Sequence, residues 1–198
     1  MISGKVYLWI RIIICCSFIG FCVENLWICA RFGYMDNRNM HLPFLLGYGI
    51  AVFLIYMLIG EPQEEGDPIY FMQVFFMVSC GEVTMGLLVE KVCGFYYWDY
   101  SALPFHVTRY TSLFTSLGFT LMTMGFMRNV FPSLNAYFSS HATDLNGISC
   151  LLCMTAIIAD HVASFVYMRN TASLQQIWRI YFRNDNHTEP KALLNEKG

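Results

Sequence analysis

The sequence predicts an all-α, polytopic integral membrane protein with about five transmembrane helices and a short amphipathic helix near its C-terminus. Of its 198 residues, 56% are hydrophobic and only 13% are charged, whereas soluble domains carry about 25% charged residues. Several segments approach the length of about 20 apolar residues that crosses a bilayer. We therefore expect a transmembrane helical domain over residues 1–168 and a cytoplasmic tail over residues 169–198.

Five segments are apolar enough to be predicted spans, and they cover residues 6–28, 44–59, 69–89, 112–130 and 145–167. The second of them is short. The first starts close to Met1, but Glu24 and Asn25 follow it where a small-residue cleavage site would stand, so we predict a retained helix and not a signal peptide. Residues 131–144 are predicted to form a loop.

The positive charges that flank each span predict its orientation, because cytoplasmic loops are enriched in Lys and Arg. The tail holds five such residues, namely Arg169, Arg179, Arg183, Lys191 and Lys197, so we place it in the cytoplasm. Counting back through five crossings puts the acidic loop 61–67 outside and the loops 32–43 and 93–111 inside. We therefore expect a multi-pass protein of the plasma membrane with its N-terminus outside.

The tail is predicted to have two parts. Leu174, Ile177, Trp178 and Tyr181 recur at helical spacing, which predicts an amphipathic helix over residues 172–183 that lies on the inner leaflet or against a partner. After Asn184 the composition becomes polar, and we expect that part to be disordered.

Charged side chains within the spans are the most informative feature, because each costs at least about 2.5–3.5 kcal/mol at the centre of a helix. Apart from Arg11, which we expect to snorkel to the outer face, they all fall in the half predicted to face the cytoplasm. With residues of the inner loops they form a candidate substrate or ion cavity: Glu24, Arg31, Asn37, Arg38, Glu82, Glu90, Lys91, Trp98, Asp99, Tyr100, Arg109 and Asp160.

Two interpretations of these charges stay open. They line a hydrated cavity, in which case neutralising Glu82, Asp99 or Asp160 leaves the fold stable and abolishes function. Alternatively they form buried ion pairs, such as Glu24 with Arg109, that only orient the helices. Glu82, Gly86 and Glu90 recur every four residues and share one helix face, where Gly86 allows a close neighbour. The histidines of the inner loops are interpreted as structural hydrogen-bonding groups.

Several short motifs resemble one bacterial family. They include Leu88-Val89-Glu90-Lys91, Trp98-Asp99-Tyr100-Ser101 and Leu103-Pro104-Phe105, together with Val23-Glu24-Asn25, Arg31, Asn37-Arg38, Pro43-Phe44, Gly47-Tyr48-Gly49, Arg109 and Asp160. The chain resembles, over about residues 20–165, the family of putative ABC-transporter type IV proteins, also called CmpB-like putative ABC transporter permeases. The turn before Gly47 is shorter than in that family, and Val107-Thr108-Arg109 replaces its Asn-Gly-Arg.

The resemblance implies a membrane permease or permease-like subunit of a transporter, with a cytoplasm-facing polar cavity and an unknown substrate. The chain has no Gly-x-x-x-x-Gly-Lys-Ser/Thr loop, so ATP hydrolysis would come from a separate ATPase subunit. Five helices are few for a complete path, which implies a homo-oligomer or a heteromer. We expect no metal and no cofactor in this chain. The net charge of −2 argues against nucleic acid as a partner.

Two other functions fit the residues. One is a membrane-embedded enzyme in which Glu82, Glu90 and Asp99 act as acid and base or hold a divalent cation. The other is a structural or regulatory membrane protein. No catalytic residue is predicted.

Overall fold

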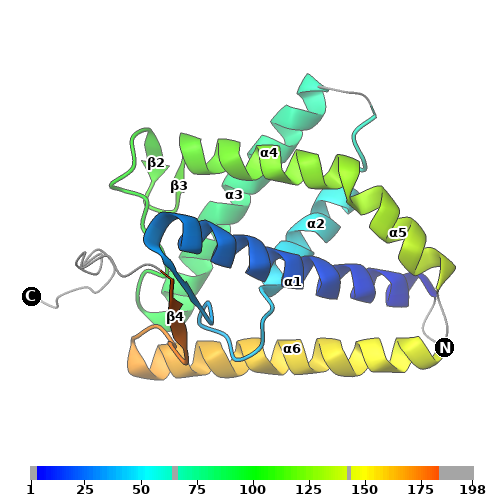
Figure 1. Cartoon of the computed structure of the whole chain (residues 1–198). Helices are drawn as coiled ribbons and strands as arrows, with labels where there is room; N and C mark the ends of the chain where they lie inside the picture. Colours follow the sequence, from blue (N-terminus) through cyan, green and yellow to red (C-terminus); the bar gives the residue numbers. More distant parts are fainter. Residues whose placement is uncertain (1–3, 64–66, 142–143, 183–198) are drawn as a thin grey trace, which may run out of the picture.

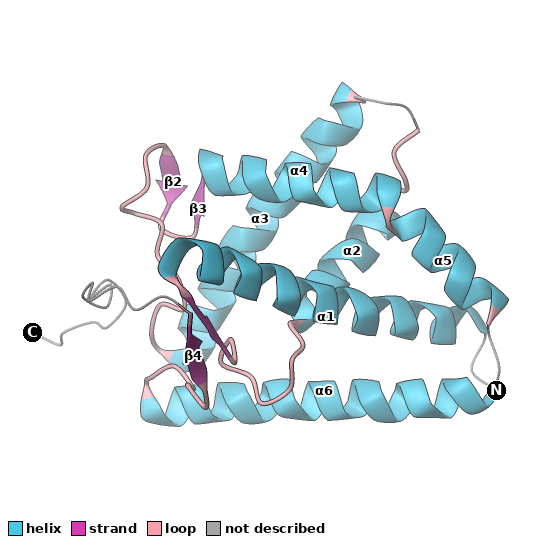
Figure 2. Ribbon diagram, viewed as in Figure 1, coloured by secondary structure: helices cyan, strands magenta, loops and turns pink. Residues whose placement is uncertain are grey.

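The computed structural model describes residues 4–63, 67–141 and 144–182, which form six helices and four short strands. The helices are α1 (Gly4–Phe32), α2 (Leu46–Leu58), α3 (Pro68–Cys93), α4 (Leu113–Asn129), α5 (Phe131–Ser140) and α6 (Asp144–Thr171). The strands are β1 (Tyr34–Asp36), β2 (His106–Thr108), β3 (Thr111–Ser112) and β4 (Arg179–Tyr181) (Figure 2).

The long helices form the framework of the molecule. In Figure 1, α1 and α6 lie side by side, α4 runs back across the molecule, and α3 crosses at a steep angle. Three helices are long and apolar enough to cross a membrane, namely α1, α3 and the part of α6 from Gly147 to Thr171. The other two predicted spans are also helical, but α2 has 13 residues and α4 has 17. Three candidate spans are therefore found among the described residues, and about five crossings stay a prediction.

The segment after α4 is a helix and not the predicted loop. The helical path bends at Val130 and continues as α5, with Pro132 in its first turn, where a proline needs no backbone N–H donor. Phe131 at the bend is fully buried. Arg11, which was expected to snorkel to the outer face, is buried and donates to the carbonyl oxygens of Phe138 and His141 at 3.4 and 3.2 Å, at the C-terminal end of α5.

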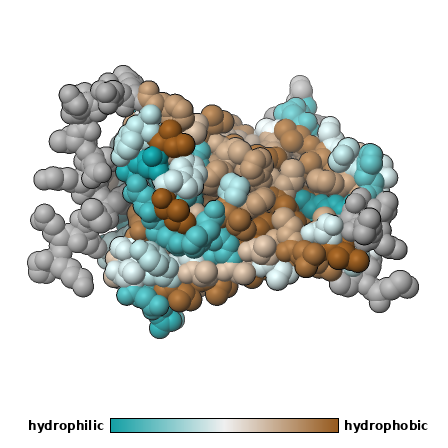
Figure 3. Space-filling view, turned by 60° about the horizontal axis from the view of Figure 1, so that its bottom comes forward, coloured by the Kyte–Doolittle hydropathy of each residue, from teal (hydrophilic) through white to brown (hydrophobic). Residues whose placement is uncertain are grey.

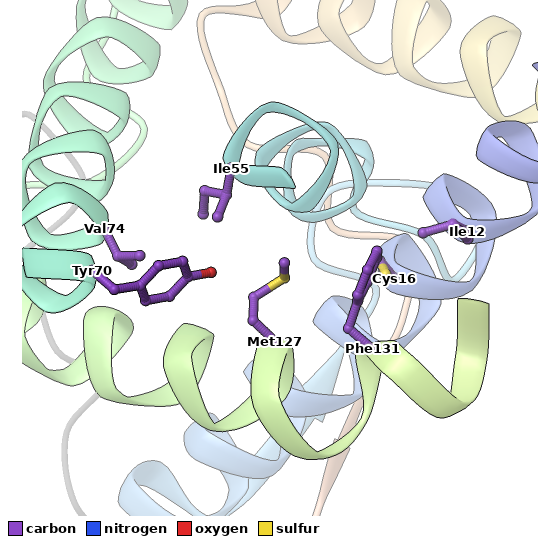
Figure 4. Packing of buried hydrophobic residues seen from close by; sticks show 7 residues of the cluster. All are labelled: Ile12, Cys16, Ile55, Tyr70, Val74, Met127 and Phe131. Carbon is purple, nitrogen blue, oxygen red and sulfur yellow. The ribbon is translucent and has the colours of Figure 1, made fainter. Parts of the chain in front are cut away.

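The main core lies where five helices meet. Its buried side chains are Ile12, Cys16, Ile55, Tyr70, Val74, Met127 and Phe131, and Figure 4 shows them converging from α1, α2, α3, α4 and α5. In lipid, burial of apolar surface adds little, because acyl chains are as apolar as the core; close packing stabilises such bundles instead.

Two glycines allow α1 and α2 to pack closely. A Cβ atom at Gly20 would lie 2.3 Å from the Tyr48 ring, and one at Gly49 would lie 2.3 Å from the carbonyl oxygen of Ile13. Larger residues at these positions would push the helices apart. The short helix α2 is therefore held against α1 by backbone proximity, and Tyr48 is seated over α1.

Side chains fix the ends of α3 and α4. Asp67 accepts hydrogen bonds from the backbone N–H groups of Ile69 and Tyr70 at the start of α3, and Ser112 with Thr115 forms a capping box at the start of α4. Such caps stabilise a helix by about 1 kcal/mol each. The cap at Ser112 also positions Thr111 and Ser116, which reappear below.

The predicted amphipathic helix over residues 172–183 is wrong for the described part of that segment. After Thr171 the chain is extended, and β4 pairs antiparallel with β1, so that Met35 lies opposite Ile180. Asn37 explains the difference: its side chain bonds the carbonyl oxygen of Gln175 at 2.9 Å and the N–H of Ile177 at 3.0 Å. These bonds hold the backbone extended. The tail predicted to be disordered lies outside the described residues.

The described surface is largely apolar, as a membrane protein requires. Large hydrophobic side chains such as Phe76, Leu121, Leu152 and Val162 are exposed on the helices. In Figure 3, hydrophobic residues cover much of the view, and hydrophilic residues gather mainly toward its left side. That is the side where α1, α3 and α6 end in Figure 1.

Candidate functional site

An ion pair between the end of α1 and the following loop forms the centre of the candidate site. The Glu24 carboxylate accepts from Nε and Nη2 of Arg38, each at 2.8 Å, and from the Tyr48 hydroxyl at 2.9 Å. Arg38 and Asn39 both have positive φ angles, 48° and 64°, and this left-handed turn folds the loop back onto α1. The predicted pairing of Glu24 with Arg109 is wrong, because Arg38 takes that position.

Tyrosines of the loop after α3 cover this ion pair. The Tyr97 hydroxyl accepts from Asn39 Nδ2 at 2.8 Å and donates to the carbonyl oxygen of Arg38 at 3.2 Å. Burial raises the pKa of Tyr97 to about 12. Burial also raises the pKa of Tyr100, and the negative charges of Glu82 and Glu24 add to the shift. Both phenols therefore keep their protons and can donate hydrogen bonds to acidic groups.

Glu82 belongs to α3, and its side chain contacts the residues around the start of α4. Its Oε2 atom accepts from the hydroxyls of Thr111 at 2.6 Å and Ser116 at 3.0 Å, and those two hydroxyls are 2.8 Å apart. Its Oε1 atom is buried and has no hydrogen-bond partner among the described residues. A buried carboxylate oxygen without a partner is costly, so this position is available to a group that enters from outside the chain.

The expected close neighbour of Gly86 is the ring of Tyr110, which would lie 2.3 Å from a Cβ atom there. The Tyr110 hydroxyl donates to Glu90 one helical turn further along α3. Burial raises the pKa of Tyr110 to about 12, and the hydrogen bond to Glu90 adds to the shift. Trp98 donates to the carbonyl oxygen of Tyr110 at 3.0 Å and so holds this loop against α3.

We call the side chains that meet between α1, α2, α3 and α4 the polar layer. They are Glu24, Arg38, Tyr48, Glu82, Tyr97, Tyr100, Thr111 and Ser116. Four of them, Glu24, Arg38, Glu82 and Tyr100, belong to the predicted cavity. Tyr48, Tyr97 and the two hydroxyl residues were not predicted, because uncharged residues in apolar or interfacial stretches carry no signal of their own.

Eight of the twelve predicted residues are not part of the polar layer, and Arg31, Lys91, Asp99 and Arg109 are four of these. Arg31 and Lys91 are exposed, and the Arg31 guanidinium lies 5.4 Å from the Phe32 ring centroid. Arg109 packs 4.0 Å over the ring of Tyr96. Asp99 is exposed and accepts from the N–H of Ser101 at 2.8 Å.

The position of Asp99 explains its acidity. Hydrogen bonds from the side chain and the backbone of Ser101 lower the pKa of Asp99. Such a bond across two residues closes a local turn. Asp99 therefore has a structural explanation that the sequence alone did not supply.

Asp160 of α6 forms a second cluster with the loop before α2. Its buried carboxylate accepts from the backbone N–H groups of His41 and Leu42 at 3.0 and 2.9 Å, and it lies 2.7 Å from His41 Nδ1. His41 Nε2 in turn lies 2.8 Å from Gln175 Nε2. In the tautomer that these contacts favour, Nδ1 donates to Asp160 and Nε2 accepts from Gln175.

His41 lines a cavity of about 220 Å³ together with Phe21 and Trp178. His41 was interpreted as a structural hydrogen-bonding group, and its contact with Asp160, 119 residues away, shows the partner that the sequence did not reveal. Both ring nitrogens of His41 have hydrogen-bond partners within the chain, which fits a structural role. The cluster joins the loop, α6 and the C-terminal segment.

A comparison with known protein families identifies the family of this chain. A family model described as Putative ABC-transporter type IV matches residues 11–165. The chain belongs to this family. No curated protein and no solved structure matches the chain.

The match to the putative ABC-transporter type IV family covers α1 through most of α6, and so includes every residue of the polar layer and Asp160. Gln175 and β4 lie beyond its end. The chain is accordingly a multi-pass membrane protein related to ABC transporters, and the residues that close the His41 cluster are additional to the matched segment.

Proposed function

We propose that this chain is a permease-like subunit of a transporter and that the polar layer is where its substrate or a coupling ion interacts. One observation carries the proposal: acidic, basic and hydroxyl side chains from four helices and two loops meet between apolar helices. Ionisable groups at such depth are costly, and when they face the interior of a bundle they commonly mark a substrate or ion path.

Glu82 is the residue on which the proposal depends most. Glu24 already accepts three hydrogen bonds and orients Arg38 and Tyr48, as a structural ion pair would. Glu82 by contrast accepts two hydrogen bonds through one oxygen and leaves the other without a partner among the described residues. A cation or a hydrogen-bond donor of the substrate would satisfy that oxygen.

Orientation and energy supply complete the proposal. We infer the orientation from the positive charges near the ends of α1 and α6, which favour a polar layer toward the cytoplasm and an N-terminus outside. A separate ATPase subunit supplies ATP hydrolysis, and the few spans of this chain form the path together with a second copy or another subunit. Co-purification of an ATPase with the tagged chain from its native membrane tests this partnership.

The test of the polar layer is a pair of substitutions on α3. Glu82→Gln keeps the shape and the hydroxyl contacts and removes the charge, whereas Thr84→Ala alters an exposed position two residues away. We expect both proteins to reach the membrane with similar melting temperatures. Glu82→Gln should fail to restore growth of a strain that lacks the gene, and Thr84→Ala should restore it. Full growth with Glu82→Gln would refute the proposal.

A further inference from the structure

A groove between α1, α2 and α4 lies directly beside the polar layer. It has a volume of about 170 Å³. Gly20 and Val23 of α1, Tyr48 and Val52 of α2, and Phe119 and Met122 of α4 line it. Thr123 of α4 also lines the groove, so its walls are apolar apart from the hydroxyls of Tyr48 and Thr123. The groove therefore offers an apolar channel to any molecule that enters from the hydrocarbon region.

Tyr48 joins this groove to the ion pair of the polar layer. Its ring packs against Gly20 and forms one wall, while its hydroxyl donates to Glu24 at 2.9 Å. Glu24 follows the groove residue Val23 directly, and Arg38 is bonded to it. An apolar wall thus ends at a pair of opposite charges, and this arrangement complements a molecule with an apolar chain and a polar head.

The size of the groove decides what fits. An α-helix with its side chains is about 10–12 Å across, too wide for a groove of about 170 Å³. A stretch of one acyl chain fits, and close packing against the groove walls would hold it there, as it holds helices together in lipid. Acyl chains are also the molecules that surround the apolar helices of a membrane protein.

We propose that the groove binds one acyl chain of a lipid-like amphiphile whose head lies at Glu24 and Arg38. This inference rests on the proposed function and names its substrate class: the transported molecule is amphipathic. The pair presents both signs of charge, which favours a zwitterionic head. Tyr48 is then a positioning residue that holds Glu24 at the end of the groove.

The experiment uses the full chain in detergent with a phosphatidylethanolamine that carries a diazirine in one acyl chain. After illumination, mass spectrometry locates the attached lipid. We expect labelled peptides from the groove faces of α1, α2 and α4, and competition by unlabelled phosphatidylethanolamine. Labels spread evenly over exposed helix faces would overturn the inference, and so would an unlabelled groove in a protein that migrates as a dimer, which would identify a second copy as the occupant.

Matched variants sharpen this experiment. Met122→Trp fills the groove from α4, and Val52→Phe fills it from α2, so at least one folded variant should be obtained. Leu121→Trp, at the next position on α4, adds the same bulk to a side chain that is 62% exposed. We expect groove labelling to fall about tenfold in these variants, which corresponds to a tenfold weaker affinity of the groove for the acyl chain. The Leu121 variant should stay within about twofold of the parent.

Growth assays separate this inference from the proposed function. If Glu82→Gln abolishes growth but the groove is not labelled, the permease proposal stands and the amphipathic substrate is wrong. If the groove is labelled but Glu82→Gln supports growth, the proposed function fails, and the groove is only a structural lipid site. Labelling together with loss of growth in both Glu82→Gln and Met122→Trp supports the inference.

Discussion

Asp160 is a carboxylate of an apolar helix, and both of its oxygens accept hydrogen bonds from the same chain. It accepts from two successive backbone N–H groups, at His41 and Leu42, and from the His41 ring. Sequence reasoning placed it in a hydrated cavity, where its neutralisation would leave the fold stable. The hydrogen bonds favour a structural role, since they anchor the loop that carries Arg38 into the polar layer.

The substitution Asp160→Asn distinguishes these roles. Asparagine has one acceptor oxygen in place of two, so one of the bonded donors loses its partner, at a cost of about 1–3 kcal/mol. We expect a lower melting temperature in detergent. Asp99→Asn, at an exposed turn, should change stability by less than about 0.5 kcal/mol. Equal melting temperatures for the two variants would instead support the interpretation that Asp160 lines a hydrated cavity.

Glu24 shows what residue spacing can and cannot predict. The position of a carboxylate near the end of α1 follows directly from the sequence. Its partner does not, because Arg31 lies two turns along the same helix and is exposed, whereas Arg38 reaches Glu24 through a left-handed turn at Arg38 and Asn39. Asn adopts positive φ more readily than most residues, but Arg does not, so the local sequence signals the turn only at Asn39.

At the scale of elements, the contact between α1 and α2 depends on Gly20. Gly20→Ala would place a Cβ atom 2.3 Å from the Tyr48 ring, which forces the two helices apart. We expect a loss of stability of about 1–3 kcal/mol and a weakened hydrogen bond from Tyr48 to Glu24. Melting temperature in detergent measures the effect.

Gly118 of α4 provides the control for that prediction. A Cβ atom there meets nothing within 4 Å, so Gly118→Ala should be neutral or stabilise the helix by up to about 1 kcal/mol. If both alanine variants behave alike, helix propensity and not close packing determines the outcome at Gly20.

The C-terminal segment shows why a periodic pattern can mislead. Leu174, Ile177, Trp178 and Tyr181 fit a helical stripe, but alternate positions such as Trp178 and Ile180 also fit a strand. Tertiary hydrogen bonds from Asn37 decide between them. The sequence therefore identified an apolar segment near the membrane, and its conformation depended on a residue about 140 positions away.

Asn37→Ala tests this account of β4. Loss of its side chain removes the bonds to the backbone of Gln175 and Ile177, and we expect faster hydrogen exchange over residues 175–182. The helices α1 and α3 should keep their protection. Gln176→Ala is the matched control because Gln176 is exposed, and it should leave exchange unchanged. Unchanged exchange in Asn37→Ala would show that strand pairing alone holds the segment.

At the scale of the whole molecule, the prediction concerns orientation. Gln63 precedes the start of α3, and Asn170 lies at the end of α6; the orientation that we propose from the positive charges puts them on opposite sides of the membrane. In a cysteine-free background, Gln63→Cys should react with a membrane-impermeant maleimide in intact cells. Asn170→Cys should react only after permeabilisation. Labelling of both in intact cells would contradict the proposed orientation.

The sequence predicted the membrane class and the helices of the five apolar segments, and it predicted four residues of the polar layer; the convergence of all its charged groups on one side of the membrane stays a prediction. It did not predict α5, β4 or the tyrosines over Glu24. Composition and hydropathy report how far a segment can be buried in lipid, and they apply to each segment alone. Bends such as that at Val130 and pairings such as His41 with Asp160 arise from contacts between distant segments.

The shortness of α2 has a consequence for the membrane itself. A helix of 13 residues is about 20 Å long, while the hydrocarbon core is about 30 Å thick. Peptide groups beyond its ends cannot remain unpaired in hydrocarbon. If α2 crosses the bilayer, neighbouring lipids have to compress or tilt around it, as for any hydrophobic mismatch. We therefore expect a locally thinner bilayer at α2, which would bring lipid head groups closer to Tyr48.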